Sequence, residues 1–353
     1  MIRSRRPWGG ECDDVDLTCG ERGEKVNQVG AITRLRQERI VKTMLAQIAR
    51  RLLVAIPTLF VIIAAAFFLM RAAPGGPFDG ERQLPKEIEQ RLEAQFNLDQ
   101  PPIIQFQRYL GNLVQGDLGP SMKYKDKTVQ QIIAEGLPTS AIIGAAAMTL
   151  ALTLGSLLGV WAALNQNKVQ DVGAMAFAVV GVCLPPLVIA PIFSLVFGVQ
   201  LHWLPTAGLY RDQYTISHLT LPVLTLALPQ IAVISRLMRA SMIEAMRSNA
   251  IRTARAKGLP EAQIVWRHAL PVAMVPIVSY LGPAISTILT GGFVIETVFQ
   301  LPGIGRQFSI AALQRDYTLV MGVVIVYAAL IIVFNMLADV MYGVLDPRAR
   351  KAA

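Results

Sequence analysis

The sequence predicts an all-α membrane protein with six transmembrane helices. Hydrophobic residues make up 53% of the 353 residues and charged residues 16%, a balance more apolar than that of ordinary soluble domains. Six uncharged stretches reach the length of about 20 residues that a helix needs to cross the hydrocarbon core, and none alternates with the period of a transmembrane β-strand. The stretches are Leu52–Met70, Gly136–Asn167, Val172–Leu201, Thr215–Ser235, Ala269–Ile295 and Tyr317–Ala338.

Basic residues are concentrated at three places beside these stretches, and their placement predicts the topology. Because cytoplasmic connections carry an excess of Lys and Arg, we expect these three places, and therefore both termini, to be cytoplasmic. The formal charge of +9 then follows from topology and contact with membrane lipid, and no nucleic-acid partner is expected. The basic residues are Arg50 and Arg51 before the first stretch, Arg236, Arg239, Arg247, Arg252, Arg255, Lys257 and Arg267 between the fourth and fifth, and Arg348, Arg350 and Lys351 after the sixth.

Four segments are expected along the chain. They are a mobile cytoplasmic tail at 1–43, the first transmembrane helix with a large external loop at 44–138, a membrane-embedded core at 139–349 that includes a long connection at 236–271, and a cytoplasmic end at 350–353. The tail mixes charged residues and glycine and cannot bury enough apolar surface to fold alone. Two interpretations of its later part stay open: residues 32–46 extend the first helix inward, or Met44 is the start of the functional chain.

The external loop is expected to contain two short amphipathic helices. Large apolar residues recur at helical spacing in both segments. The two helices would form a cap on the outer ends of the spans, which serves either as a docking surface or only as packing on the membrane face. The helical positions are Ile88, Leu92 and Phe96 between Pro85 and Asn97, and Phe106, Leu110 and Leu113 before Gly116.

The connection between the fourth and fifth spans is far longer than two neighbouring helices require. Ala250 to Lys257 is predicted to be a short basic helix that Gly258 ends, and Pro260 is placed to start a second helix through His268. The result is a helix-turn-helix on the cytoplasmic face. Small residues at Ala250 and Ala254 would permit close approach by another protein.

This loop resembles the coupling loop of the binding-protein-dependent ABC importer permeases. The family pattern is Glu-Ala-Ala, three residues, Gly, nine residues, Ile, one residue, Leu-Pro, and the chain carries Thr253, Ala254, Gly258, Leu270 and Pro271 at the corresponding spacing. It departs from the pattern with Arg and Thr in place of Glu-Ala, and with His in place of Ile. The wider strings Arg252-Thr-Ala-Arg-Ala-Lys-Gly-Leu259 and Arg267-His-Ala-Leu270 resemble the dipeptide, oligopeptide and nickel branch.

Further strings in the same order resemble that branch, and two of them resemble the B-type permease of oligopeptide systems. The branch-like strings are Ala73-Pro-Gly75, Gly116-Asp-Leu-Gly119, Glu296-Thr-Val-Phe299, Leu301-Pro-Gly-Ile-Gly305, Arg315-Asp-Tyr317 and Asp346-Pro-Arg348. The B-type strings are Pro77-Phe-Asp-Gly-Glu-Arg82 and Gly119-Pro-Ser-Met-Lys-Tyr-Lys-Asp126.

The resemblance implies a bacterial inner-membrane transport subunit that forms half of a pore for oligopeptides. Its implied partners are a second homologous permease, two cytoplasmic ATPases that grip the loop, and an external binding protein that delivers the peptide. ATP and Mg would bind the ATPase chains, and no cofactor is expected on this one. A dipeptide or nickel permease of the same branch is the alternative.

Two groups of residues are candidates for function. In the loop, Ala254, Gly258, Leu270 and Pro271 are the expected structural determinants, beside Thr253, and Arg252, Arg255 and Lys257 are the expected polar contacts with an ATPase. The alternative for these bases is binding of anionic lipid or a role in topology alone. Glu296 is the candidate for the substrate pathway, where it would contact the amino terminus of a peptide; the alternative is a hydrated or base-paired structural carboxylate.

Other functional classes lack their motifs. No Gly-x-x-x-x-Gly-Lys-Ser/Thr string is present, so ATP is expected on a separate chain, and no metalloprotease helix or serine elbow supports an enzyme. An ion-coupled secondary transporter would show midplane carboxylates or inverted repeats, and neither is evident. A non-transporting scaffold is a third alternative. Vanadate sensitivity of transport distinguishes ATP coupling from ion coupling.

Overall fold

The computed structural model describes residues 49–72, 76, 94, 96, 98–124, 126–208 and 216–345. The chain divides into two compact units, Met1–Leu52 and Leu53–Ala353, and every labelled helix belongs to the second. In the described residues the regular structure is helical, and the backbone pairing outside the helices is one isolated bridge between Pro120 and Thr128.

Five described helices are long and apolar enough to cross a membrane, and they confirm five of the six predicted spans. The second of them begins earlier than predicted because Thr128 and Gln131 form a capping box at its amino end. The fourth predicted span runs on past its basic residues. The five helices are Ala49–Ala72, α4 (Val129–Leu164), α7 (Ile216–Met246), α11 (Val275–Val298) and α13 (Tyr317–Leu345).

The remaining predicted span, Val172–Leu201, is not one continuous helix. It forms α5 (Val169–Cys183), then α6 (Pro186–Phe193) and the π-helix η1 (Ser194–Gln200), and the two halves are bent by 102° at the break. Leu184 has ψ 115 and Pro185 has ψ 144, so both are extended. Proline lacks an amide hydrogen and pushes the preceding residue out of the helical region, which explains the break.

The most extensive contact between long helices is the crossing of α4 with α7, where two glycines of α4 meet large residues of α7. A Cβ atom added at Gly155 would lie 3.0 Å from the Ile234 side chain, and one added at Gly159 would lie 2.6 Å from Met238 Cβ. Absence of a side chain at these positions lets the backbones approach. Gly155 and Gly159 therefore serve the packing of α4 on α7.

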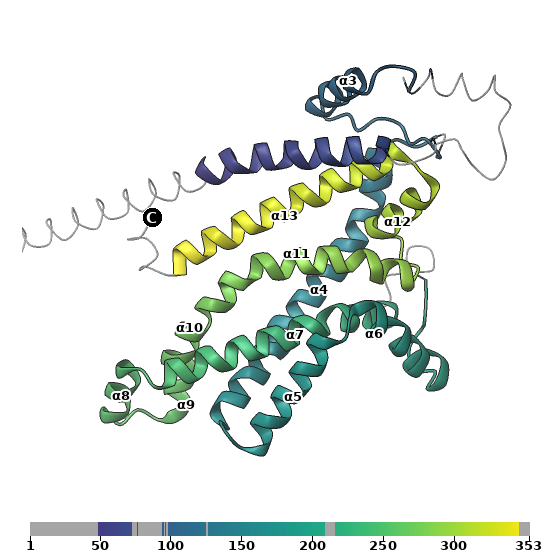
Figure 1. Ribbon diagram of the computed structural model, residues 1–353. Coiled ribbons are helices and arrows are strands. Elements are labelled where there is room, and N and C mark those ends of the chain that lie inside the picture. Colours follow the sequence, from purple (N-terminus) through teal and green to yellow (C-terminus); the bar gives the residue numbers. More distant parts are fainter. Residues whose placement is uncertain are drawn as a thin grey trace, which may run out of the picture. The chain divides into compact units, whose positions relative to one another are not determined.

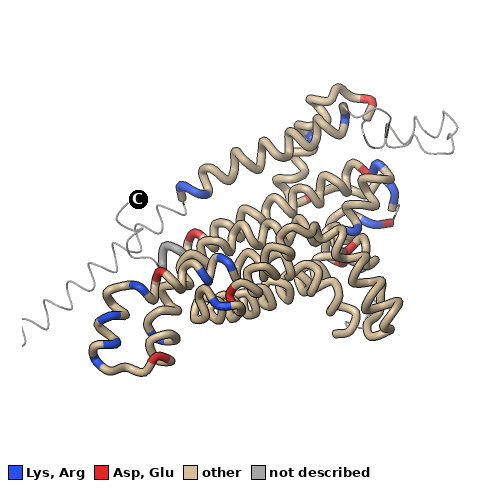
Figure 2. The backbone as a smooth tube through the Cα atoms, turned by 60° about the horizontal axis from the view of Figure 1, so that its bottom comes forward, with Lys and Arg blue, Asp and Glu red and all other residues tan. Residues whose placement is uncertain are grey.

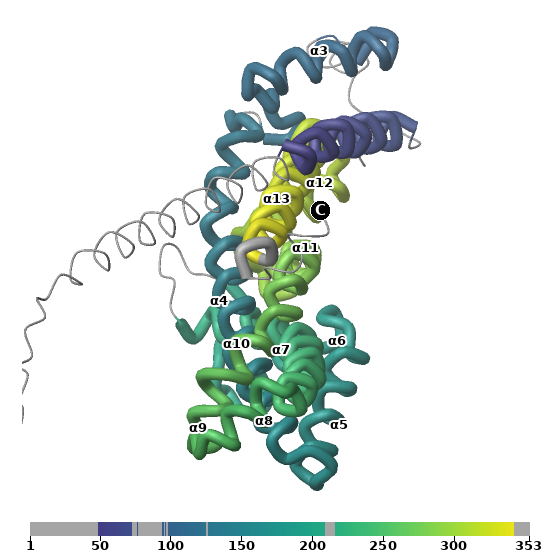
Figure 3. The backbone as a smooth tube through the Cα atoms, turned by 90° about the vertical axis from the view of Figure 1, so that its left-hand side faces the viewer, coloured from purple at the N-terminus to yellow at the C-terminus, as the bar shows by residue number. Residues whose placement is uncertain are grey.

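Helix α7 occupies the centre of the helices around it. It contacts α4, α5, α6, α10 and α11, and Figures 1 and 3 show α7 between α4 and α6. Of its most apolar window 61% is buried, whereas the other four spans reach 11 to 33%. Movement of α7 must therefore be passed to most of its neighbours.

The second helix predicted in the external loop is present as α3 (Pro102–Val114). Its Phe106 packs on Phe67 of the first span, with ring centroids 5.1 Å apart, and joins Met321 and Ile325 of α13 in one apolar cluster. The helix therefore packs on the spans. Of the helix expected at 85–97, the structure describes residues 94 and 96 alone, and the tail at 1–43 lies outside the described residues.

We expect Gly159→Leu to destabilise the protein, since the new side chain must displace Met238 and the Ser235 carbonyl. Overpacking of this kind costs about 1–3 kcal/mol. The midpoint of thermal unfolding in detergent should fall. Gly173→Leu on α5 is the matched control, because a Cβ there meets nothing within 4 Å, and its midpoint should not fall. Equal midpoints for the two variants would contradict the close crossing.

Candidate functional site

The loop after α7 folds into the predicted helix-turn-helix. It comprises α8 (Asn249–Ala256), α9 (Glu261–Gln263), the π-helix η2 (Ile264–Ala269) and α10 (Leu270–Ala273), which leads into α11. Figure 1 shows α8 and α9 together beyond the end of α7. We refer to residues 247–273 as the connecting loop.

One face of α8 is buried within the chain itself. Ile251 is 1% exposed and Ala254 5% exposed, and both belong to the same apolar cluster as Ile264 of η2. The expectation that Ala254 offers a small surface to another protein is therefore wrong, because its small side chain instead lets α8 approach η2. Ala250 is exposed, as that expectation requires. Ala254 keeps its predicted place as a structural determinant of the loop.

Gly258 ends α8 as predicted. Its φ of +76 lies in the left-handed region that glycine adopts without a steric cost. Its amide donates to the Arg255 carbonyl at 2.9 Å, and the Leu259 amide donates to the Ala254 carbonyl at 3.3 Å. These two bonds satisfy carbonyls at the end of the helix.

The loop carries five basic residues, and Figure 2 shows several of them on the loop at lower left. Arg255 pairs with Glu261 across the turn, with Nε to Oε1 at 2.7 Å. The hydrogen bonds from Arg255 lower the pKa of the Glu261 carboxyl, so the pair is lost only as the pH falls through that lowered pKa. Arg252 and Lys257 are exposed.

Glu261 was missed by sequence reasoning, although it directly follows Pro260, at which the second helix was predicted to start. Its partner Arg255 was assigned to contacts with another chain, whereas the structure joins it to its own loop. Thr253 is exposed and its hydroxyl donates to the Asn249 carbonyl. Leu270 is half-buried against the main apolar cluster, and Pro271 lies exposed in the first turn of α10.

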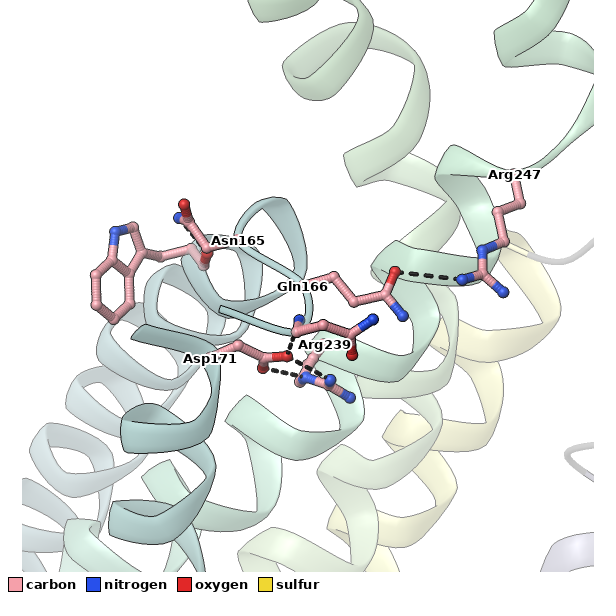
Figure 4. Close-up of polar contacts among 7 residues, drawn as sticks. Asn165, Gln166, Asp171, Arg239 and Arg247 are labelled. Atoms are coloured by element: carbon pink, nitrogen blue, oxygen red, sulfur yellow. Dashed lines mark hydrogen bonds and ion pairs between the residues drawn. The ribbon is translucent and has the colours of Figure 1, made fainter. Parts of the chain in front are cut away.

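The base of the loop is anchored to the turn between α4 and α5. Arg239 of α7 pairs with Asp171 of α5, and Arg247 donates to the Gln166 side chain at 3.3 Å. Figure 4 shows both contacts spanning from α7 to this turn. The arginines had been taken as topology determinants, and the sequence carries no local signal for partners so far away along the chain.

Glu296 is not exposed to solvent, and within the described residues it is not paired with a base. It is 2% exposed, and its Oε2 accepts from the Gly305 amide at 2.8 Å and the Arg306 amide at 3.3 Å. These amides open helix α12 (Ile304–Gln314), so the carboxylate caps that helix. A Cβ added at Gly303 would meet this carboxylate. The structure thus gives Glu296 a structural role in place of the proposed contact with a peptide.

A second buried carboxylate at that end also caps a helix. Asp316 is fully buried, and its Oδ1 accepts from the Leu319 amide at 3.1 Å at the start of α13. It also accepts from the Ser121 hydroxyl and from the Met122 amide at 3.2 Å, which ties the segment before α4 to α13. The sequence singled out the string around it without assigning this role.

Three of the family-like strings, at 73–75, 77–82 and 346–348, lie outside the described residues, as do the basic residues after the sixth span. Within the part of the chain that the structure describes, no group of three His, Cys, Asp or Glu residues is placed to hold a metal ion.

Comparison with known proteins places these features in a family. Residues 155–351 match the family described as binding-protein-dependent transport system inner membrane component. The oligopeptide transport system permease protein OppB of Salmonella typhimurium is 50% identical over 307 residues, which is 87% of this chain and 100% of that protein. The dipeptide transport system permease protein DppB of Bacillus subtilis is 39% identical, over 83% of this chain and 94% of that protein.

A crystal structure of an amino acid ABC transporter with histidines is similar over 60% of this chain and 94% of its own, with 20% identity and a TM-score of 0.46. The family match covers more than half of the chain, and the relatives match along nearly their whole length. The chain therefore belongs to the family of binding-protein-dependent transport system inner membrane components.

Proposed function

We propose that this chain forms half of the translocation pathway of an ATP-driven importer of oligopeptides in the bacterial inner membrane. The observation that carries the proposal is the connecting loop, which is an ordered helix-turn-helix set directly on the buried helix α7. The identity of 50% to an oligopeptide permease over the full length of that protein supports the substrate class. The pathway would be completed by a second homologous permease.

The loop is suited to act as a lever for an ATPase. Ile251 and Ala254 on its inner face pack in the apolar core. Ala250, Arg252 and Lys257 are exposed on its outer face. The pair of Arg255 with Glu261 braces the turn. ATP and Mg would be bound by two partner ATPases, and an external binding protein would deliver the peptide.

The proposed topology has six spans and both termini in the cytoplasm. The turn between α4 and α5 contacts the end of α7 that carries the connecting loop. Beyond η1, Gly208 donates to the Phe299 carbonyl near the other end of α11. The bent pair α5 and α6 with η1 therefore leads from one end of the helices to the other, which supports counting it as one span. The basic loop then lies in the cytoplasm.

We expect uptake of labelled pentapeptides by the intact system to be abolished by vanadate, because transport is driven by ATP hydrolysis. Uptake of di- and tripeptides and of nickel should be measured in the same cells. Vanadate-sensitive uptake of dipeptides or nickel alone would move the substrate to a sister branch. Transport that is insensitive to vanadate would contradict ATP coupling.

We expect Gly258→Val to reduce peptide uptake about tenfold. A β-branched side chain at positive φ costs about 1–2 kcal/mol, which is enough to displace α8 from α9. Gly208→Val is the matched control, since Gly208 has φ +81 and, like Gly258, open space around it. Uptake should be retained in the control, and both proteins should be present in the membrane. Equal losses in the two variants would mean that strain alone, and not the loop, lowers uptake.

We expect Arg252→Glu combined with Lys257→Glu to weaken retention of the ATPases during purification and to lower uptake. Both side chains are on the exposed outer face of the loop, where charge reversal acts on a partner. Lys168→Glu is the control, because Lys168 is an exposed base in the neighbouring turn. If binding of anionic lipid were the role of these bases, the control would lower uptake as well.

A further inference from the structure

Asp171 is a buried carboxylate that joins two spans at the end of the helices where the connecting loop lies. It is 2% exposed and lies in the first turn of α5. Its oxygens accept from Arg239 Nε at 2.5 Å, from the second guanidinium nitrogen of Arg239 at 2.6 Å, and from the Asn167 amide at 2.9 Å. Figure 4 shows the guanidinium of Arg239 facing both oxygens. The pair is bidentate, the geometry that fixes direction as well as distance.

Stability alone does not account for a charge pair at this place. Removing two charges from water is costly, and a well-packed apolar pair of similar volume is often as stable. What the pair adds is a fixed register between α5 and α7. This is the best-attested use of buried ionic groups.

The rest of the interface between α5 and α7 has little else to fix that register. The residues of α5 that are buried there are small: Ala174, Ala178 and Gly181. A Cβ added at Gly181 would lie 3.1 Å from the Ala232 side chain of α7. Side chains of this size carry no polar group that could hold α5 to α7 through a hydrogen bond. Among the described residues, the bidentate pair with Arg239 is the directional contact between α5 and α7.

Arg239 also links the connecting loop to α5, because it lies on the helix that leads into the loop. It belongs to the last turns of α7, and only Arg247 and Ser248 separate α7 from α8. Arg247 holds Gln166 in the same turn that carries Asp171 into α5. A displacement of α8 and α9 is therefore carried along one rigid helix to two contacts with the turn between α4 and α5. From that turn, α5 leads to the 102° break before α6.

We propose that the Asp171–Arg239 pair is a transmission contact, which makes α5 move with α7 when an ATPase moves the connecting loop. Both are positioning residues, since they act on the broken span and not on the peptide. The proposal rests on the proposed function of this chain as an ATP-coupled permease. It predicts that loss of the pair separates ATP hydrolysis from transport.

The test uses the complete importer in proteoliposomes, with its binding protein, a labelled pentapeptide and ATP. Asp171→Asn and Arg239→Gln should each lower the number of peptides transported per ATP hydrolysed about tenfold. The rate of ATP hydrolysis stimulated by the peptide-loaded binding protein should stay within about twofold of that of the unaltered importer, which is a change of less than about 0.5 kcal/mol in the activation free energy. The double variant Asp171→Arg with Arg239→Asp should recover part of the ratio. Glu135→Gln is the control, because it breaks the exposed ion pair with Lys127, which is 2.6 Å long, and it should leave the ratio unchanged.

If the pair had a merely structural role, its loss would lower ATP hydrolysis and peptide uptake in proportion. The number of peptides transported per ATP would then be unchanged, and that outcome would overturn the proposal. Absence of ATP-dependent uptake in the unaltered importer would instead overturn the proposed function.

A second measurement needs no variant of the pair. Spin labels at Gln170 and Ala250, both exposed positions, are placed in an importer in which Cys12, Cys19 and Cys183 are replaced by Ser. The distance between the labels should be the same in the nucleotide-free and vanadate-trapped states, because α5 and the loop move together. A distance that changes between the two states would overturn the proposal even where Asp171→Asn does not assemble.

Discussion

The close crossing of α4 with α7 at Gly155 and Gly159 is the contact on which the rest of the arrangement depends. It places α7 in the middle of its neighbours, where it is buried to a greater extent than any other described span. A buried helix cannot change position without moving what packs on it. The connecting loop is continuous with this helix and is rooted through Ile251 and Ala254 in the same apolar cluster. A force on the loop is therefore a force on the core of the protein.

In the part of the chain that the structure describes, three buried carboxylates lie at the starts of helices. Glu296 caps α12, Asp316 caps α13, and Asp171 lies in the first turn of α5. Amides at helix starts have no partner within the helix, and water is scarce at membrane depth, so an acidic side chain nearby satisfies them and favours the helix dipole. An ionisable residue in an apolar span is a functional candidate by default. In this protein, the surroundings of Glu296 and Asp316 assign these two residues to the scaffold, whereas Asp171 joins α5 to α7 through Arg239.

Sequence reasoning succeeded where the signal is local. The length of the uncharged stretches predicted five of the spans. The positions of Gly258 and Pro260 predicted the helix-turn-helix and its turn. It failed where the outcome depends on residues distant in the chain. The inward orientation of Ala254 follows from η2 folding back on α8. The 102° bend after Leu184, by contrast, has a local signal in Pro185 and Pro186, which counting apolar residues overlooks. The pairing of Asp171 with Arg239 joins two helices that are separate in sequence, and nothing in either segment alone specifies it.

The central claim is that the outer face of α8 is where an ATPase acts on this chain. Site-specific cross-linking in the assembled importer tests it most directly, with a single cysteine at Ala250 or at Ala254 in a chain whose own cysteines are replaced. Ala250 is exposed and Ala254 is buried against η2. The cysteine at 250 should form a cross-link to an ATPase subunit, and the cysteine at 254 should form none. A complex that is active in transport yet gives no cross-link from position 250, or gives equal cross-links from both positions, would contradict the account.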